Sequence, residues 1–225
     1  LKKELEEIDP LVIMFLKHIH EIKWQTDDTK GTISKSDRQT IKSKTGQLAK
    51  SIRITSSVSK NESSNDSDKI DLNFLVFKSF VSENIGETRD NTVNIVFNLS
   101  DDGKSVLPLK KMNIFSFLPT KQLSHTSFIV QAPFDLVKSR ESLLETSKKN
   151  PELWNALNDL FGESIRFFSS EGFVDLDFLN MMPFETHYFI PENNFLDTFK
   201  EIISNIPLIP TQEGGFAYPY EAAIP

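Results

Sequence analysis

The sequence predicts an α+β fold, because two hydrophobic periodicities divide the chain. Between Glu21 and Ala132, apolar residues alternate with polar ones or form short apolar runs, and both patterns are typical of β-strands. From Ser139 onward, apolar residues recur every three or four positions, as on one face of a helix. A block of strands followed by a block of helices indicates a sheet with separately placed helices.

Residues 1–20 are predicted to form a connecting helix from a preceding domain, in one or two pieces. Apolar residues recur at helical spacing through this stretch. Asp9 and Pro10 are a favourable N-cap and first-turn pair, which indicates that a second short helix starts there. His18 and His20 would then lie at a helix end, where a charged imidazole suits the negative end of the dipole.

The first strands are predicted to be half exposed. Ile22 and Trp24 alternate with polar neighbours, and Ile52 and Ile54 do the same. Since this part is rich in polar residues, one face of the strands over residues 21–59 is expected to meet solvent.

A polar loop and four apolar strands follow. Residues 60–69 are a low-complexity polar segment, predicted to be the loop of a hairpin. Asp101-Asp102-Gly103 supplies a further turn. The apolar strands are predicted at Ile70–Val81, Thr92–Leu99, Met112–Leu118 and Ser127–Ala132.

Three helices are predicted after the strands. They are Ser139 to about Lys149, a second helix that restarts at Asn150-Pro151-Glu152, and a third from about Glu192 to Asn205. The apolar face of the second consists of Leu153, Leu157, Leu160, Phe161 and Ile165, and that of the third of Phe195, Phe199, Ile202 and Ile206.

The chain is predicted to divide into a middle domain and a helical extension. Residues 21–149 form the α/β middle domain, and residues 150–225 form the extension. The last part, residues 207–225, is expected to be extended, with Gly214-Gly215 as a turn.

The composition excludes several classes of function. The chain has 225 residues, no cysteine and a net charge of −7. Without cysteine it forms no disulfide and no thiolate metal site. A negatively charged protein is poorly suited to the phosphate backbone of nucleic acids, so direct nucleic-acid binding is not expected. No apolar run reaches the roughly 20 residues that cross a bilayer, and we expect a cytoplasmic protein without a membrane partner.

Nucleotide-binding and metal-binding motifs are incomplete. Gly103-Lys104-Ser105 resembles the end of a phosphate-binding loop, but the glycine required about five residues earlier is Asn98. We therefore expect a hairpin turn there. The histidines lack the cysteine and acidic neighbours of a metal site, so no metal is predicted.

Arg140 is the main candidate for chemistry. It lies at the predicted junction of a strand and a helix, where helix amides would add positive potential. A guanidinium held there can bind a phosphate as a two-pronged donor. The alternative is that Arg140 pairs with Glu141, Glu145 or a neighbouring helix, as surface arginines commonly do.

Short motifs follow one another in a consistent order along most of the chain. They are Leu11–Ile22, Phe117–Thr120, Phe128–Phe134 followed by Ser139–Glu141, Trp154-Asn155, and Ile209–Thr211 continued by Gly214 and Pro219–Pro225. Their order and spacing together resemble the region after the ATP-binding domain in sacsin-like proteins. These belong with the ninety-kilodalton heat-shock chaperones to the GHKL ATPases.

The resemblance implies a middle or transducer domain: a mixed, mostly antiparallel sheet with helices packed on one face. It implies that Arg140 reaches the γ-phosphate of ATP bound, with Mg, mainly by a preceding domain. Ser139 and Glu141 would shape the loop around that arginine. Leu136-Val137-Lys138 departs from the proline-containing approach of the chaperones. By this interpretation the chain, which starts at Leu1, is a piece of a chaperone-like ATPase and does not hydrolyse ATP alone.

Two other interpretations stay open. The chain has 19 phenylalanines, and a non-catalytic module that binds protein clients would use exposed ones, for example around residues 184–189. Core packing is the ordinary role of such residues. GHKL ATPases also serve in defence and DNA transactions, although the acidic composition argues against direct nucleic-acid contact.

Overall fold

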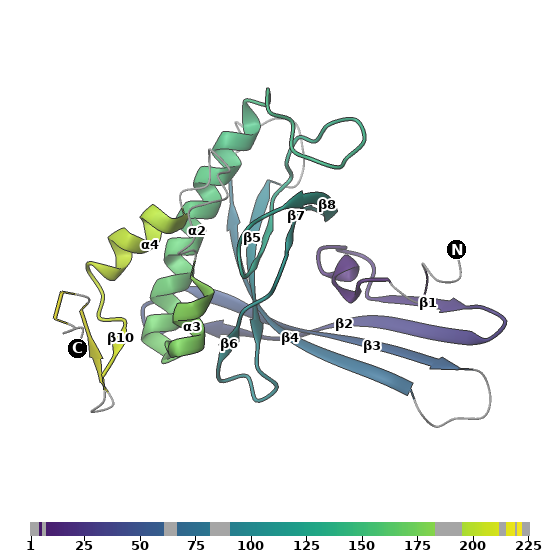
Figure 1. Cartoon of the computed structure of the whole chain (residues 1–225), viewed down its shortest axis with the longest axis horizontal. Coiled ribbons are helices and arrows are strands. Elements are labelled where there is room, and N and C mark those ends of the chain that lie inside the picture. Colours follow the sequence, from purple (N-terminus) through teal and green to yellow (C-terminus); the bar gives the residue numbers. More distant parts are fainter. Residues whose placement is uncertain are drawn as a thin grey trace.

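The computed structural model confirms an α+β fold built on one large sheet (Figure 1). It describes residues 5, 8–60, 67–81, 91–182, 195–211, 215–218 and 220–221. The helices in this part of the chain are a 3-10 helix η1 (Pro10–Ile13) and the α-helices α2 (Lys149–Glu171), α3 (Leu176–Met181) and α4 (Phe195–Ile203).

The sheet is mixed but mostly antiparallel, as predicted. The main strands are β1 (Glu21–Gln25), β2 (Thr29–Lys42), β3 (Leu48–Lys60), β4 (Ser67–Phe80), β5 (Thr92–Leu99), β6 (Val106–Leu107), β7 (Asn113–Ser116), β8 (Leu118–Leu123) and β9 (Ile129–Gln131). Their order is β1-β2-β3-β4-β5-β9-β7-β8, with β6 beside β5. Only the β7–β9 pair is parallel among the strand pairs of the described residues.

The predicted strands fall close to the observed ones, with two differences. The predicted polar loop over residues 60–69 is shorter, since β3 and β4 pair from Lys50↔Val76 to Ser59↔Ser67 and residues 61–66 lie outside the described part. The stretch predicted as one strand to Leu118 contains a reversal at Phe117, and β8 then runs back along β7. Phe117 has a φ of 64°, which lets the chain turn within a single residue.

Both faces of the sheet are buried in its central part. Alternate residues of β4 and β5 point to opposite faces, so each strand contributes to two separate cores. One core lies beneath α2, α3 and α4 and includes Leu75, Phe77, Val93, Ile95, Phe97, Phe128, Phe161, Phe168, Phe178, Phe195 and Phe199. The other lies beneath η1 and includes Leu11, Ile13, Met14, Ile33, Ile52, Ile54, Phe74, Val76, Val96, Phe115 and Ile129. The predicted placement of the α-helices on one face of the sheet therefore agrees with the packing.

The second helical piece, predicted to start at Asp9 and Pro10, is short. It begins at Pro10, and Oδ1 of Asp9 accepts a hydrogen bond from the Leu11 N–H at 2.9 Å, so the predicted cap is confirmed. It ends at Ile13, and the prediction of a helix over residues 1–20 is wrong for the described residues after Met14.

A contact from the sheet explains where this helix ends. The ammonium of Lys35 donates hydrogen bonds to the carbonyls of Met14 (3.2 Å) and Leu16 (2.7 Å). A longer α-helix would need these carbonyls for its own backbone bonds. His18 and His20 consequently lie in an irregular segment leading to β1, and the prediction that they lie at a helix end is wrong.

The long helix α2 begins where predicted, but its cap is a different residue. The hydroxyl of Ser147 accepts hydrogen bonds from the backbone N–H groups of Lys149 (3.1 Å) and Asn150 (3.2 Å), which satisfies two of the free donors of the first turn. Asn150, the predicted cap, is instead the second residue of the helix. The helix ends at Gly172, whose φ of 77° is the left-handed conformation that favours glycine.

The helix predicted from Ser139 to Lys149 is absent. Residues 137–148 form turns and one bridge between Leu136 and Leu143. The short helix α3, capped by the side chain of Asp175, was not predicted. Helix α4 lies within the predicted third helix, and of the predicted inward residues Phe195, Phe199 and Ile202 are buried and Ile206 is partly buried.

The C-terminal part contains a small separate hairpin. Strands β10 (Ile209–Pro210) and β11 (Phe216–Ala217) pair antiparallel. This agrees with the predicted extended segment and turn, although Gly214 lies outside the described residues. The core beneath α2 combines residues before and after position 150, and the division into domains at that position stays a prediction.

Gly31 offers a test of the packing on the first two strands. It pairs with Trp24, and a Cβ at Gly31 would lie 1.9 Å from Cζ2 of that indole. We expect Gly31→Ala to lower the free energy of unfolding by about 1–3 kcal/mol, because the ring must leave its place. Thermal unfolding and the fluorescence of Trp24 measure this. Gly215→Ala is the control, since its nearest atom would be 3.6 Å away, and an equal effect of both substitutions would contradict the argument.

Candidate functional site

The segment that carries Arg140 is a tight loop with paired ends, defined here as the Arg140 loop (residues 136–143). Leu136 and Leu143 form an antiparallel bridge at its base. Within it, the Val137 N–H donates to the Ser142 carbonyl at 3.1 Å, and the Arg140 N–H donates to the Val137 carbonyl at 2.8 Å. These bonds fix the backbone of the loop in one conformation.

Strand β8 holds the loop from the side. The Lys121 N–H donates to the Glu141 carbonyl at 2.8 Å, and the Leu143 N–H donates to Oε1 of Gln122 at 2.8 Å. The side chains of Lys121 and Glu141 also form an ion pair. The loop is thus fastened to the edge of the main sheet, which the sequence did not indicate.

Arg140 itself is exposed and has a φ of 61°. Its guanidinium has no hydrogen-bond or ion-pair partner within the described part of the chain, since Glu141 is paired with Lys121. Helix α2 begins at Lys149, so the prediction that Arg140 lies at a helix N-terminus is wrong, and helix amides do not add to its charge. Ser139 is likewise exposed in the turn and caps no helix.

Asn150 joins the two ends of the Arg140 loop to the start of α2. Its Oδ1 accepts from the Asp135 N–H at 2.9 Å, and its Nδ2 donates to the carbonyls of Asp135 (3.0 Å) and Leu144 (3.2 Å). The side chain is buried, with 5% exposed. The Ser147 hydroxyl donates to the Asp135 carboxylate at 2.7 Å, which adds a further link. The loop therefore has a fixed position relative to the helix.

We expect Asn150→Ala to lower the free energy of unfolding by about 2–3 kcal/mol. The substitution removes three hydrogen bonds to partly buried backbone groups of Asp135 and Leu144, each of which contributes about 0.5–1.5 kcal/mol. Chemical denaturation measures the loss. Trypsin should also cleave faster after Lys138 and Arg140, because the base of the loop opens more often.

The control for this prediction is Asn205→Ala. Asn205 is exposed, and its side chain donates a single hydrogen bond to the Glu201 carbonyl. Its replacement should change stability by under about 0.5 kcal/mol. A loss that small for Asn150→Ala would show that the hydrogen bonds of the Asn150 side chain contribute little to stability.

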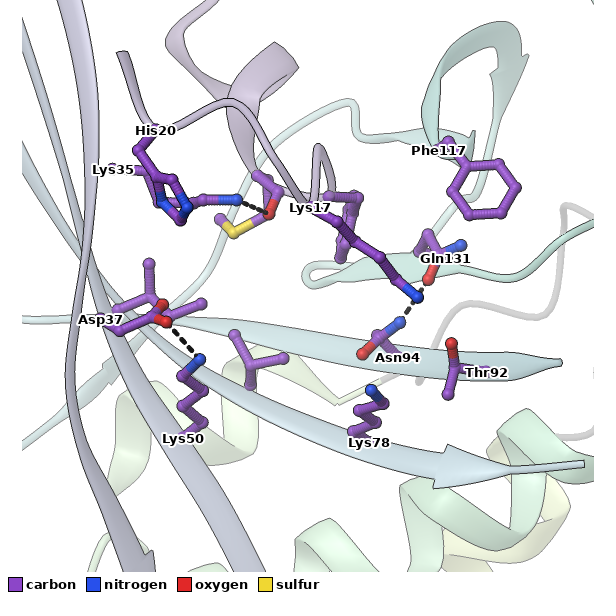
Figure 2. A pocket seen from close by; sticks show the side chains of 14 residues that line it. Lys17, His20, Lys35, Asp37, Lys50, Lys78, Thr92, Asn94, Phe117 and Gln131 are labelled. Atoms are coloured by element: carbon purple, nitrogen blue, oxygen red, sulfur yellow. Dashed lines mark hydrogen bonds and ion pairs between the residues drawn. The ribbon is translucent and has the colours of Figure 1, made fainter. Parts of the chain in front are cut away.

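A second candidate site is a pocket of about 250 Å³ on the sheet face that bears η1. Figure 2 shows its side chains, which come from the segment after η1, from strands β2, β3, β4, β5 and β9, and from Phe117 between β7 and β8. The lining consists of Met14, Phe15, Lys17, His20, Lys35, Asp37, Lys50, Ile52, Val76, Lys78, Thr92, Asn94, Phe117 and Gln131. Sequence reasoning did not bring these residues together as a site.

The lining is basic, in contrast to the whole chain. It contains four lysines and one carboxylate, whereas the net charge of the chain is −7. The carboxylate of Asp37 pairs with the ammonium of Lys50 at 2.5 Å. Desolvation by burial lowers the pKa of Lys35, while nearby Asp37 raises it and Lys50 lowers it further.

A signal for this pocket exists in the strand pattern. On several strands, the side chains that share one face are apolar at one end of the strand and polar at the other. The examples are Ile54-Ile52-Lys50, Phe74-Val76-Lys78, Val96-Asn94-Thr92 and Ile129-Gln131. The apolar members form the core beneath η1 and the polar members line the pocket. The pattern becomes visible only when the strands are placed side by side in register.

The sequence also led to predictions about the Gly103 turn, metal-binding groups and membrane-spanning helices. Gly103 lies in a turn with a φ of 71°, closed by the Ser100 N–H bond to the Ser105 carbonyl at 2.9 Å, so the predicted hairpin turn is confirmed. Among the described residues no group of three or more histidine or acidic residues could hold a metal ion. None of the helices described is long and apolar enough to cross a membrane.

Comparison of the chain with protein-family models, with curated proteins and with solved structures gave no match in any of the three. The resemblance to the region after the ATP-binding domain of sacsin-like GHKL ATPases thus stays a prediction that rests on the motifs named above.

Proposed function

We propose that this chain is the middle, transducer-like region of a chaperone-like ATPase, in which Arg140 contacts the γ-phosphate of ATP bound by a preceding domain. The observation that carries the proposal is the state of Arg140: an exposed guanidinium without a partner in the described part of the chain, on a loop fixed by the sheet and by α2. Mg and most contacts to ATP would come from the preceding domain.

Several features of the loop suit that role. A guanidinium can give two parallel hydrogen bonds to a phosphate, and its charge is constant at physiological pH. Because the loop backbone is already ordered, little conformational entropy is lost when the arginine meets its partner. The ion pair between Lys121 and Glu141 removes the acidic neighbour that would otherwise compete for Arg140. Ser139 and Glu141 then act as positioning residues.

The domain would also couple hydrolysis to movement. An arginine supplied across a domain boundary stabilises charge on the transferred phosphoryl group and loses its contact after hydrolysis. The Arg140 loop is joined through Asn150 to α2, and α2 spans the core beneath it. A change in the position of the loop would therefore move the helix and sheet as one body.

The experiment is ATP turnover by the full-length protein, with and without Arg140→Ala. The proposal expects a large loss of turnover, and Mg-ATP should not be hydrolysed by the 225-residue chain alone. Unchanged turnover and unchanged ATP affinity in the variant would overturn it.

The alternative of a protein-interaction module receives less support from the packing. Most described phenylalanines lie in the two cores, and Phe80 and Phe216 are the large exposed ones among them, with 78% and 44% exposed. The stretch 184–189, where exposed phenylalanines were expected, lies outside the described residues.

A further inference from the structure

The basic pocket (the lining residues of Figure 2) has a local excess of positive charge. Lys17, Lys35, Lys50 and Lys78 come from four separate segments and meet around one cavity. Like charges so placed repel one another, and burial of an ammonium opposes its charged form. Asp37 is the one carboxylate in the lining, and it is paired with Lys50.

Two of these lysines have defined partners: Lys50 pairs with Asp37, and Lys35 has a structural role. The Lys35 ammonium holds the carbonyls of Met14 and Leu16 and so fixes the segment that forms one wall. Lys78 has no such role: its ammonium lies 4.8 Å from the centre of the Phe80 ring and has no carboxylate partner within the described residues. An ammonium of this kind is available to an anion.

Polar groups in the floor point to a ligand with several acceptor atoms. Gln131 is buried, with 2% exposed, and its Oε1 accepts a hydrogen bond from Nδ2 of Asn94. Its amide NH₂ group has no partner in the part of the chain that the structure describes. This amide donor borders the cavity, where water or a ligand can accept from it.

The remaining wall is apolar. Ile52, Val76, Phe15 and Phe117 contribute the apolar part of the lining. The left-handed backbone at Phe117 turns the chain so that this ring borders the pocket. A cavity volume of about 250 Å³ is enough for an anionic group with a small organic part.

We propose that this pocket binds a small phosphate ester, with Lys17 and Lys78 neutralising the phosphate dianion, Gln131 donating to one of its oxygens, and the organic part lying against Phe15 and Phe117. A phosphate ester carries close to two negative charges and three strong acceptor oxygens. Lysines bind such groups as point charges, and a basic cleft concentrates them from solution. This site is separate from the Arg140 loop and does not depend on the function proposed for it.

The test is isothermal titration calorimetry with phenyl phosphate and inorganic phosphate at equal ionic strength. Phenyl phosphate should bind about fivefold or more tightly than inorganic phosphate, because the ring buries apolar surface. The double variant Lys17→Gln with Lys78→Gln should weaken phenyl phosphate binding about tenfold or more. The matched control, Lys104→Gln with Lys110→Gln, changes the charge equally at exposed lysines outside the pocket and should leave the Kd within about twofold.

A second measurement keeps the proposal testable if the double variant does not fold. In the wild-type chain, phenyl phosphate should shift the side-chain amide NMR signals of Asn94 and Gln131. Absence of binding, absence of these shifts, or an equal loss in the control pair would overturn the proposal. Arg140→Ala should leave the Kd unchanged, so a loss of binding in that variant would place the anion at the Arg140 loop instead.

Discussion

Replacing Arg140 with alanine in the full-length protein is expected to lower the turnover number for ATP about a thousandfold or more. Arginines that reach a transferred phosphoryl group from a second domain contribute about 10³–10⁵ to turnover. The loss should be mainly in kcat, because the contact is strongest when charge develops on the γ-phosphate. Steady-state turnover, together with ATP affinity measured by titration, checks this.

Two further variants distinguish this role from a general effect of charge. Arg140→Lys keeps the charge but loses the two-pronged geometry, so turnover should be intermediate. Arg166→Ala removes an exposed arginine from α2, outside the Arg140 loop, and should leave turnover within about twofold. If the Arg166 variant lost as much activity as the Arg140 variant, the specific role of Arg140 would be wrong.

Replacing Phe168 with alanine is expected to lower the free energy of unfolding by about 3–5 kcal/mol. Phe168 is fully buried, and its ring lies between α2 and the sheet. The distances from its ring centre to those of Phe77, Phe97 and Phe178 are 5.4, 4.8 and 5.3 Å, all with edge-to-face geometry. Since a whole domain is stable by only about 5–15 kcal/mol, the loss should be evident in urea unfolding.

Phe80→Ala is the matched control, because it removes the same side chain from an exposed position. Phe80 is 78% exposed and contacts the ammonium of Lys78. Its replacement should cost under about 1 kcal/mol, which is the size of an exposed cation–π contact. A comparable loss from both substitutions would mean that the core beneath α2 does not depend on Phe168 as its packing indicates.

The strands were predictable because their signal is local. Alternation at β3 reflects one face that meets a core, and the short apolar runs at β4, β5 and β9 reflect burial of both faces. The start of α2 was predictable for the same reason, since Pro151 and the apolar spacing from Leu153 lie within a few residues. The fold class follows from these elements alone.

The Arg140 loop was mispredicted because distant contacts override its local pattern. Ser139 followed by Glu141, Leu143 and Leu144 has the spacing of a capped helix. In the structure, backbone bonds from Lys121 and the amide of Gln122 hold that segment against β8 instead. Helix propensity differs by less than about 1 kcal/mol per ordinary residue, so a few such bonds are sufficient to decide the conformation.

The basic pocket could not be found along the sequence, because its lysines lie on three different strands and on the segment after η1. Lys50 and Lys78 are 28 positions apart in the numbering, and each has the ordinary surroundings of an exposed strand residue. The register places Lys50 opposite Val76 and Lys78 opposite Asn94, and this brings the two lysines to one face. The sequence of one strand does not determine which side chains of the neighbouring strands lie beside it.

The sequence by itself thus determined the elements of the sheet, the long helix and the exposed arginine as a candidate for chemistry. These depend on spacing within one segment, where steric preference and local burial decide the outcome. Tertiary structure alone decided the end of η1, the shape of the Arg140 loop and the gathering of lysines around one pocket. In each of these, a partner more than a dozen residues away supplies hydrogen bonds, contacts or charge. These interactions outweigh the conformational preference of the local sequence.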